Sequence, residues 1–217
     1  MVLEDLGDCK DMLFLYSNGK IEHRVLEKLV TILSEIHQTP VPTDFPDNLE
    51  MRKLNHQHIF SLPFMVDNGF SLDAIQTGLQ ELSMPYKQDE QLKKQISDIG
   101  DKYLSPGTTL LHGDYYPGSW MTDENQLYVI DPEFGFAGFA EFDIGVMLAH
   151  MIMATQSEDY ATKITSAYPG KIDVQLTQQV AGIEIMRRLI GLAQLPLAIP
   201  LEINKRLLAL AKKMILS

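Results

Sequence analysis

The chain has 217 residues, of which 45% are hydrophobic and 22% charged. This balance is typical of a soluble globular protein, excludes a disordered or collagen-like chain, and at this length favours one sizeable domain. Lys and Arg number 18 against 29 Asp and Glu, a formal net charge of −11, which disfavours nucleic-acid binding because that needs clustered positive charge.

The single cysteine, Cys9, excludes an internal disulfide and a thiolate zinc site, so we expect a reducing compartment. The first ten residues carry acidic side chains where a signal peptide would have a basic and then an apolar region. The longest central apolar stretch, residues 144–154, is too short for a membrane span. We therefore expect a cytoplasmic protein that does not insert into a membrane.

The predicted elements are mostly helical. Between Ile21 and Gln38 apolar residues recur at three- and four-residue spacing, and a loop rich in proline follows at residues 39–48. Two short β-like segments lie at 108–111 and 127–130, and we expect them to pair as a hairpin. Helical patterns occupy six further segments, 71–82, 89–104, 141–155, 157–168, 174–193 and 200–216. The sequence thus predicts a mainly α chain with a small β-hairpin, an α+β fold.

Carboxylates follow both β-like segments. Asp114 comes shortly after the first and Asp131 directly after the second, so the predicted pairing would bring the two together. In an extended Asp131-Pro132-Glu133 stretch the two acidic side chains would project to the same side. Mg²⁺ prefers such hard oxygen ligands and often needs only one or two of them, so the sequence indicates a magnesium site.

The triplet His112-Gly113-Asp114, followed by a β-like segment ending in Asp131, resembles the catalytic core of the aminoglycoside phosphotransferase and choline kinase group of protein-kinase-like enzymes. The Asp-Pro-Glu-Phe run at 131–134 and the Phe-Asp-Ile-Gly run at 142–145 are most similar to methylthioribose kinases. The resemblance implies an ATP- and Mg²⁺-dependent phosphotransferase. It would transfer the γ-phosphate to a hydroxyl of a small polar metabolite or an aminoglycoside-like substrate.

The resemblance also implies a role for each residue. Asp114 would accept the proton of the attacking hydroxyl, and Asp131 would hold Mg²⁺ on the nucleotide. His112 and Asp143 would support the catalytic loop by hydrogen bonds. Five residues after Asp114, where the family usually has a metal-binding Asn, this chain has Ser119. A hydroxyl is the weaker magnesium ligand, so Glu133 is expected to supply a second carboxylate beside Asp131 and Ser119.

The resemblance covers the chain as a C-terminal lobe only. Residues 11–217 would form the helical lobe, with a catalytic hairpin at about 108–133, and residues 1–10 would remain from the hinge. The backbone of Glu4, Asp5 and Leu6 would contact adenine there. The sequence shows neither the Gly-rich loop nor the strand lysine of such kinases, so the N-terminal lobe is expected to be absent.

Two alternative functions remain open, the first because of that departure and the second because of the carboxylates alone. The chain would be a catalytically inactive kinase-like module that binds a ligand or a protein through the face an N-terminal lobe would cover. Alternatively, the same carboxylates would support metal-dependent hydrolysis of a phosphate ester.

For two other pairs of polar residues, one of arginines and one of histidines, a structural role is favoured over a functional one. Arg187 and Arg188 lie in a predicted helix, where ion pairs are favoured over contact with an anionic substrate. His56 and His58 form a His-x-His pair, but no aspartate-rich partner motif follows them, so hydrogen bonding is favoured over a metal site.

Overall fold

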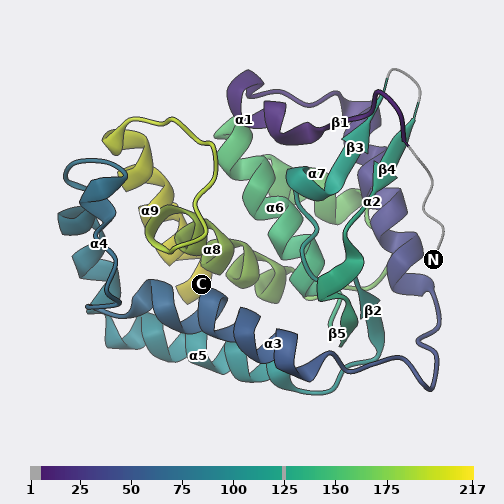
Figure 1. Ribbon diagram of the computed structural model, residues 1–217, viewed down its shortest axis with the longest axis horizontal. Helices are drawn as coiled ribbons and strands as arrows, with labels where there is room; N and C mark the ends of the chain where they lie inside the picture. Colours follow the sequence, from purple (N-terminus) through teal and green to yellow (C-terminus); the bar gives the residue numbers. More distant parts are fainter. Residues whose placement is uncertain (1–5, 124–125) are drawn as a thin grey trace.

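The computed structural model describes residues 6–123 and 126–217, which are mainly helical with two small antiparallel sheets (Figure 1). The α-helices are α1 (Leu15–Asn18), α2 (His23–Gln38), α3 (Leu49–His56), α4 (Leu79–Lys87), α5 (Glu90–Leu104), α6 (Glu141–Thr155), α7 (Tyr160–Ala167), α8 (Val174–Ile190) and α9 (Leu201–Leu216). The strands are β1 (Lys10–Asp11), β2 (Thr109–Leu111), β3 (Trp120–Thr122), β4 (Leu127–Val129) and β5 (Phe136–Gly138). Within the described ranges, no helix combines the length and the apolar character needed to cross a bilayer.

The strand pairing differs from the predicted one. β3 forms a hairpin with β4 and also pairs with β1, whereas β2 pairs with β5, so that Leu111 faces Phe136. The prediction that residues 108–111 pair with 127–130 is therefore wrong, because these segments lie in different sheets. Only four residues separate β3 from β4 in the sequence, and closing so small a loop costs less chain entropy than closing the longer one between β2 and β4.

The core is centred on α6, which is buried around its whole circumference from Phe142 to Ala154. It packs against α8, and α8 packs against α9 (Figure 1). Met147, Met151 and Met153 of this helix are fully buried. A helix that is apolar on all sides needs such complete cover, and its few polar residues therefore need specific partners.

The predicted helices are confirmed with one exception, and further helices are present. The segment 71–82 does not form one helix: a 3-10 turn covers Leu72–Ala74, and α4 starts only after Gly78, which adopts a left-handed conformation (φ 86°). The Asp73 carboxylate fixes this offset by accepting the N–H groups of Gly78 and Gln80. Helix α3, which is largely polar, was not predicted.

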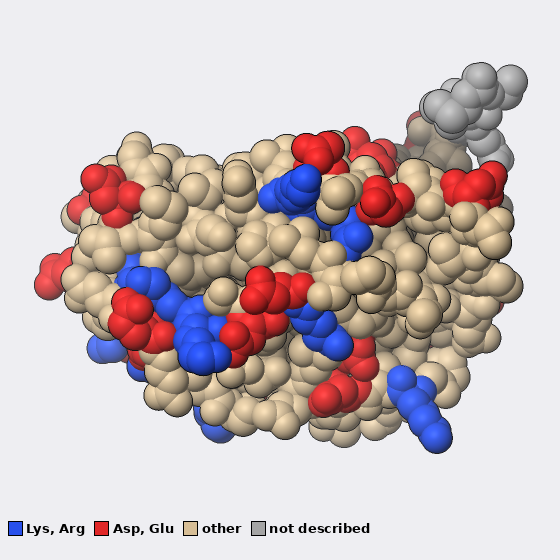
Figure 2. All heavy atoms as spheres, turned by 90° about the horizontal axis from the view of Figure 1, so that it is seen from below, with Lys and Arg blue, Asp and Glu red and all other residues tan. Residues whose placement is uncertain are grey.

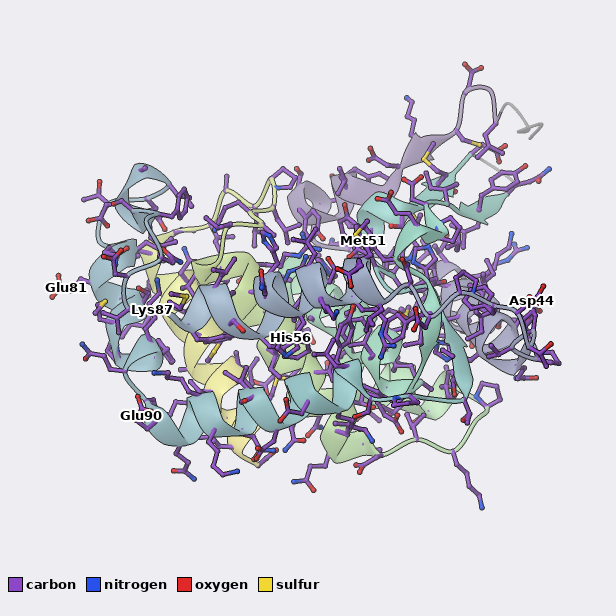
Figure 3. All side chains as sticks on the ribbon, turned by 60° about the horizontal axis from the view of Figure 1, so that its bottom comes forward. Asp44, Met51, His56, Glu81, Lys87 and Glu90 are labelled. Atoms are coloured by element: carbon purple, nitrogen blue, oxygen red, sulfur yellow. The ribbon has the colours of Figure 1, made fainter. Side chains whose placement is uncertain are left out.

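Helices α3, α4 and α5 lie between α2 and β2 in the sequence, and Figure 3 shows α3 and α5 side by side. The loop bearing Asp44 lies at one end of this layer and Lys87 at the other (Figure 3). The face that these helices present carries interspersed acidic and basic side chains (Figure 2), several of them in ion pairs such as Lys94–Asp98. Lys87 is fully buried without a hydrogen-bond partner among the described residues, and burial lowers its pKa.

Candidate active site

The loop that follows β2 is fixed by one buried carboxylate. Asp143, on the first turn of α6, accepts the backbone N–H groups of His112 at 2.7 Å and Gly113 at 3.0 Å. His37, at the end of α2, donates from Nε2 to the same carboxylate at 3.2 Å. Hydrogen bonds to an ionised carboxylate are among the stronger ones. Asp143 thus joins α2, α6 and the loop at a single buried point.

His112 and Ser119 connect this loop to Ile130, the residue after β4. His112 donates from Nε2 to the carbonyl of Ile130 at 2.8 Å, and its Nδ1 accepts the N–H of Asp114 at 3.3 Å. The Ser119 hydroxyl donates to the carbonyl of Asp114 at 2.9 Å, while the Ser119 carbonyl accepts the N–H of Ile130 at 3.0 Å. These crosslinks, and not a pairing of β2 with β4, tie the backbone at Asp114 to the residue that precedes Asp131.

Gly113 allows a second close approach between the same segments. Its φ is +86°, and a Cβ at this position would lie 2.2 Å from the carbonyl oxygen of Phe134. The loop and the chain after Asp131 therefore meet backbone against backbone.

Gly113→Ala is expected to destabilise the fold more than Gly69→Ala does. Gly69 also has a positive φ, +74°, but its Cβ position is open, so alanine there adds only the left-handed strain of about 1–2 kcal/mol. At Gly113 the clash with Phe134 adds about 1–3 kcal/mol more. Urea denaturation of the two variants measures the difference, and equal free energies of unfolding would contradict this close approach.

The segment after β4 is a turn and not the extended stretch predicted. Asp131 adopts a left-handed conformation (φ 60°, ψ 56°) and precedes a 3-10 turn over Pro132–Phe134, which is closed by the N–H of Gly135 on the carbonyl of Pro132. The prediction that Asp131 and Glu133 share one side of a strand is therefore wrong. A non-glycine residue in this region costs about 1–2 kcal/mol, and such strain is often found at functional sites.

Asp114 lies in a cationic environment. Its Oδ1 is 3.4 Å from a terminal nitrogen of Arg188, and 22% of its side chain is exposed. Burial raises the pKa of Asp114, while the charges of Arg188 and Arg187 lower it. The guanidinium of Arg188 lies 4.9 Å from the centre of the Tyr116 ring. Burial and then the charge of Asp114 raise the pKa of Tyr116, and the charge of Asp131 adds a smaller effect in the same direction.

Arg188 is held by a buried charge network on α8. The Glu184 carboxylate accepts from Arg188 Nε at 2.6 Å, from Arg187 at 2.9 Å and from His150 Nε2 at 3.1 Å. The other nitrogen of His150 accepts the hydroxyl of Tyr16. Burial alone would raise the pKa of Glu184, but the two arginines hold it well below its usual value. The ion pairs favoured from the sequence are present, and one of the two arginines also reaches Asp114.

The two carboxylates predicted to bind magnesium follow β4. Asp131 and Glu133 are both exposed. The described residues contain no group of three or more His, Cys, Asp or Glu side chains able to hold a metal. Mg²⁺ commonly takes one or two carboxylates and completes its shell with phosphates and water, so a larger group is not needed. Ser119 is buried and donates to the loop, and its hydroxyl oxygen still has lone pairs, so its ligand role stays a prediction.

Of the three residues predicted to contact adenine, the structure describes only Leu6. Glu4 and Asp5 are outside the described residues. Leu6 is half-buried, and its carbonyl accepts the N–H of Cys9 at 3.3 Å. Its adenine contact stays a prediction.

A cavity of about 400 Å³ opens beside Arg188. Apolar side chains from residues 75–79, from the end of α8 and from the loop between α8 and α9 line it together with three amides. These lining residues include Leu79, Leu195, Ile199, Gln76, Gln194 and Asn204. None of the residues lining the cavity is acidic.

Two residues that touch this site were not singled out from the sequence. His37 is the penultimate residue of α2 and carries no local signal for its contact with Asp143. Asn48 contacts the segment after Asp131 and stands directly before α3, where Asn is a common helix-start residue. The position of Asn48 could have indicated the start of a helix from the sequence, but it would have predicted a helix cap and not the observed contact.

Comparison with known proteins relates this site to enzymes. Methylthioribose kinase 1 of Oryza sativa subsp. japonica is 34% identical over 113 residues, which are 52% of this chain and 26% of that protein. Methylthioribose kinase of Geobacillus thermodenitrificans is 28% identical over 182 residues, 67% of this chain and 45% of that protein. The matches thus span less than half the length of these relatives.

A family model, described as the phosphotransferase enzyme family, matches residues 16–175. This range contains the loop 112–119, Asp131 and Asp143. Since the match extends over well more than half of the sequence, the chain belongs to the phosphotransferase enzyme family.

Proposed function

We propose that residues 11–217 form the C-terminal lobe of an ATP- and Mg²⁺-dependent kinase that phosphorylates a hydroxyl group of a small acceptor. The observation that carries this proposal is the setting of Asp114. Its loop is fixed by Asp143 and His112, yet its carboxylate remains partly exposed, next to Arg188. A base that acts on a bound hydroxyl needs this combination of fixed position and access.

The proposed roles follow from charge and position. Asp114 accepts the proton of the acceptor hydroxyl, and its raised pKa makes it a better base than an unperturbed aspartate. Asp131 and Glu133, with Ser119 nearby, bind the metal. When bound, Mg²⁺ would neutralise charge on the nucleotide phosphates. His112 and Asp143 hold the loop, and they touch no reacting atom.

The acceptor we propose is a small sugar or polyol with an apolar substituent. The cavity beside Arg188 has apolar walls and amide groups and no acidic lining residue. A polycationic aminoglycoside would find no counter-charge there, whereas hydroxyl groups can bind the amides of Gln76, Gln194 and Asn204. The names of the relatives, methylthioribose kinases, describe an acceptor of this kind.

The second candidate is an inactive kinase-like module that binds a partner. It is favoured by a mostly apolar hollow of about 550 Å³ that borders the site, lined by residues such as Ile36, Phe45, Leu110, Val129 and Pro132. Open apolar surface of this kind often marks an interaction site.

The change in melting temperature with Mg-ATP separates the two candidates. At about 100 times Kd, nucleotide binding adds roughly 2.7 kcal/mol, which is a rise of roughly 5–10 °C for a chain of this size. We expect this rise in the wild type and in Asp44→Asn, an exposed control, and its loss in Asp131→Asn. No rise in the wild type would support the binding module.

A further inference from the structure

The residues that follow Asp131 are held from outside by the start of α3. The side-chain amide of Asn48 donates to the carbonyl of Glu133 at 2.8 Å and to the carbonyl of Gly135 at 3.2 Å. Because both partners are carbonyls, which only accept, the NH₂ end of the amide must face them. Asn48 is 85 residues from Glu133 in the sequence, so this contact joins two distant segments.

The backbone of Asn48 frees its side chain for this contact. Its left-handed conformation (φ 51°, ψ 33°) is one that Asn tolerates better than most residues. The side chain does not cap α3, and the carboxylate of Asp47 accepts the N–H of Leu49 instead. The carbonyl of Asn48 accepts the N–H of Arg52, so the first turn of the helix starts at Asn48.

Arg52 anchors that same turn. Its side chain is buried, and one guanidinium nitrogen donates to the carbonyls of Tyr103 at 2.6 Å and Ser105 at 2.9 Å. The guanidinium also lies 4.4 Å from the centre of the Phe136 ring in β5. The start of α3 is therefore fixed to the end of α5, beside which it lies in Figure 3, and to the strand that follows the Asp131 segment.

The Asp131 segment has little structure of its own to hold it. Its left-handed residue is unfavourable, Pro132 has no N–H to donate, and the turn closes on a single backbone hydrogen bond from Gly135. A strained conformation persists only where its surroundings fix it.

We propose that Asn48 is a positioning residue that clamps residues 133–135 and thereby orients the carboxylates of Asp131 and Glu133. In its metal-binding part this inference rests on the proposed function, because it takes those carboxylates as the magnesium ligands. Groups that orient metal ligands without touching the metal typically change metal affinity 10- to 100-fold when lost.

Three variants of the full chain test the clamp. Asn48→Gly keeps the left-handed backbone and removes the amide. Asn48→Asp keeps the shape and has no N–H to donate. The control is Gln156→Gly, since Gln156 is also a left-handed non-glycine residue (φ 57°) whose amide bonds a distant side chain, Arg206.

The first measurement is amide hydrogen exchange. We expect the amides of residues 133–138 to exchange about tenfold faster in both Asn48 variants, with α6 and α8 unchanged, and at the wild-type rate in Gln156→Gly. Wild-type exchange at 133–138 in both Asn48 variants would overturn the clamp. So would equally faster exchange throughout α6 and α8, which would indicate general destabilisation.

The second measurement is the affinity for Mn²⁺ in the presence of ADP. We expect it to fall about tenfold in Asn48→Gly and Asn48→Asp and to stay unchanged in Gln156→Gly. Equal affinity in the wild type and both Asn48 variants would overturn the link to the metal. If the wild type itself binds no Mn²⁺-ADP, the proposed function fails, and hydrogen exchange alone decides whether Asn48 clamps the segment.

Discussion

Replacing Asp114 with Asn is expected to lower kcat of phosphoryl transfer about 10²- to 10⁴-fold, since an amide cannot accept the proton of the acceptor hydroxyl. The side chain keeps its size, and Arg188 keeps its ion pair with Glu184, so the fold should persist. We also expect the KM for ATP to change little, because Asp114 does not bind the metal in this proposal. Steady-state kinetics with methylthioribose as acceptor, together with the melting temperature, measure both effects.

Asp44→Asn is the matched control, because it makes the same chemical change at an exposed site in the loop before α3. It should retain wild-type kcat. If Asp114→Asn also retained kcat within a few-fold, Asp114 would not be the base. If it lost activity together with its melting temperature, the effect would be on folding.

Removing the carboxylate of Glu184 is expected to cause the largest loss of stability. Glu184→Ala leaves Arg187 and Arg188 in place with their buried counter-charge gone, and breaking one partner of a buried ion pair costs about 3–5 kcal/mol. For a chain of this length that corresponds to a fall in melting temperature on the order of 10 °C. Calorimetry of the variant, with the exposed Glu81→Ala as control, measures it.

Glu184→Gln removes the charge of the side chain and keeps its size. We expect it to lower the stability nearly as much as Glu184→Ala does. A fall no larger than that of Glu81→Ala would show that the network carries little of the fold's stability. Lower pH should act in the same direction. The pKa of Glu184 is depressed in the folded chain, so its contribution is present above the usual range of Glu and is lost as the pH falls through the folded pKa.

His150 extends this acid sensitivity to higher pH. Burial lowers its pKa to about 4, from an ordinary value of 6.5. Between these values the unfolded chain binds more protons than the folded one, so stability falls as the pH drops from 6.5 towards 4. The wild-type melting temperature should therefore already decline in mildly acidic solution.

The helices could be predicted where one pattern controlled them. In α2 and α5 an apolar stripe faces the core, and α6 is almost wholly apolar, with Asp143 and His150 as its buried polar residues, so spacing and burial agree. Helix α3 was not predicted because the residue that anchors it is Arg52, and the burial of Arg52 depends on the carbonyls of distant residues. The strand pairing could not be predicted either, because strands of three residues carry too few side chains to specify a partner and a register.

The contacts around the proposed site could not be predicted from the sequence. Asp114 and Asp131 were recognisable because each follows a β-like segment, but the expected pairing between those segments does not exist. The crosslinks through His112 and Ser119 replace it, and they depend on backbone carbonyls that a sequence does not display. The contact of Arg188 with Asp114 joins residues 74 positions apart, a separation at which spacing carries no information.

The position of the buried helix α6 has a consequence for engineering the specificity for the acceptor. Two of its buried polar side chains point to different parts of the site. The Asp143 carboxylate hydrogen-bonds the loop that bears Asp114, and the His150 imidazole hydrogen-bonds Glu184 in the arginine network. Apart from Arg188, which belongs to that network, the cavity beside it is lined by residues from 75–79 and 189–204, outside this helix. In the proposed function, the residues that hold the loop of Asp114 and most of those that would surround the acceptor are therefore separable. We expect a library confined to the exposed cavity wall to alter acceptor choice while leaving that loop in place.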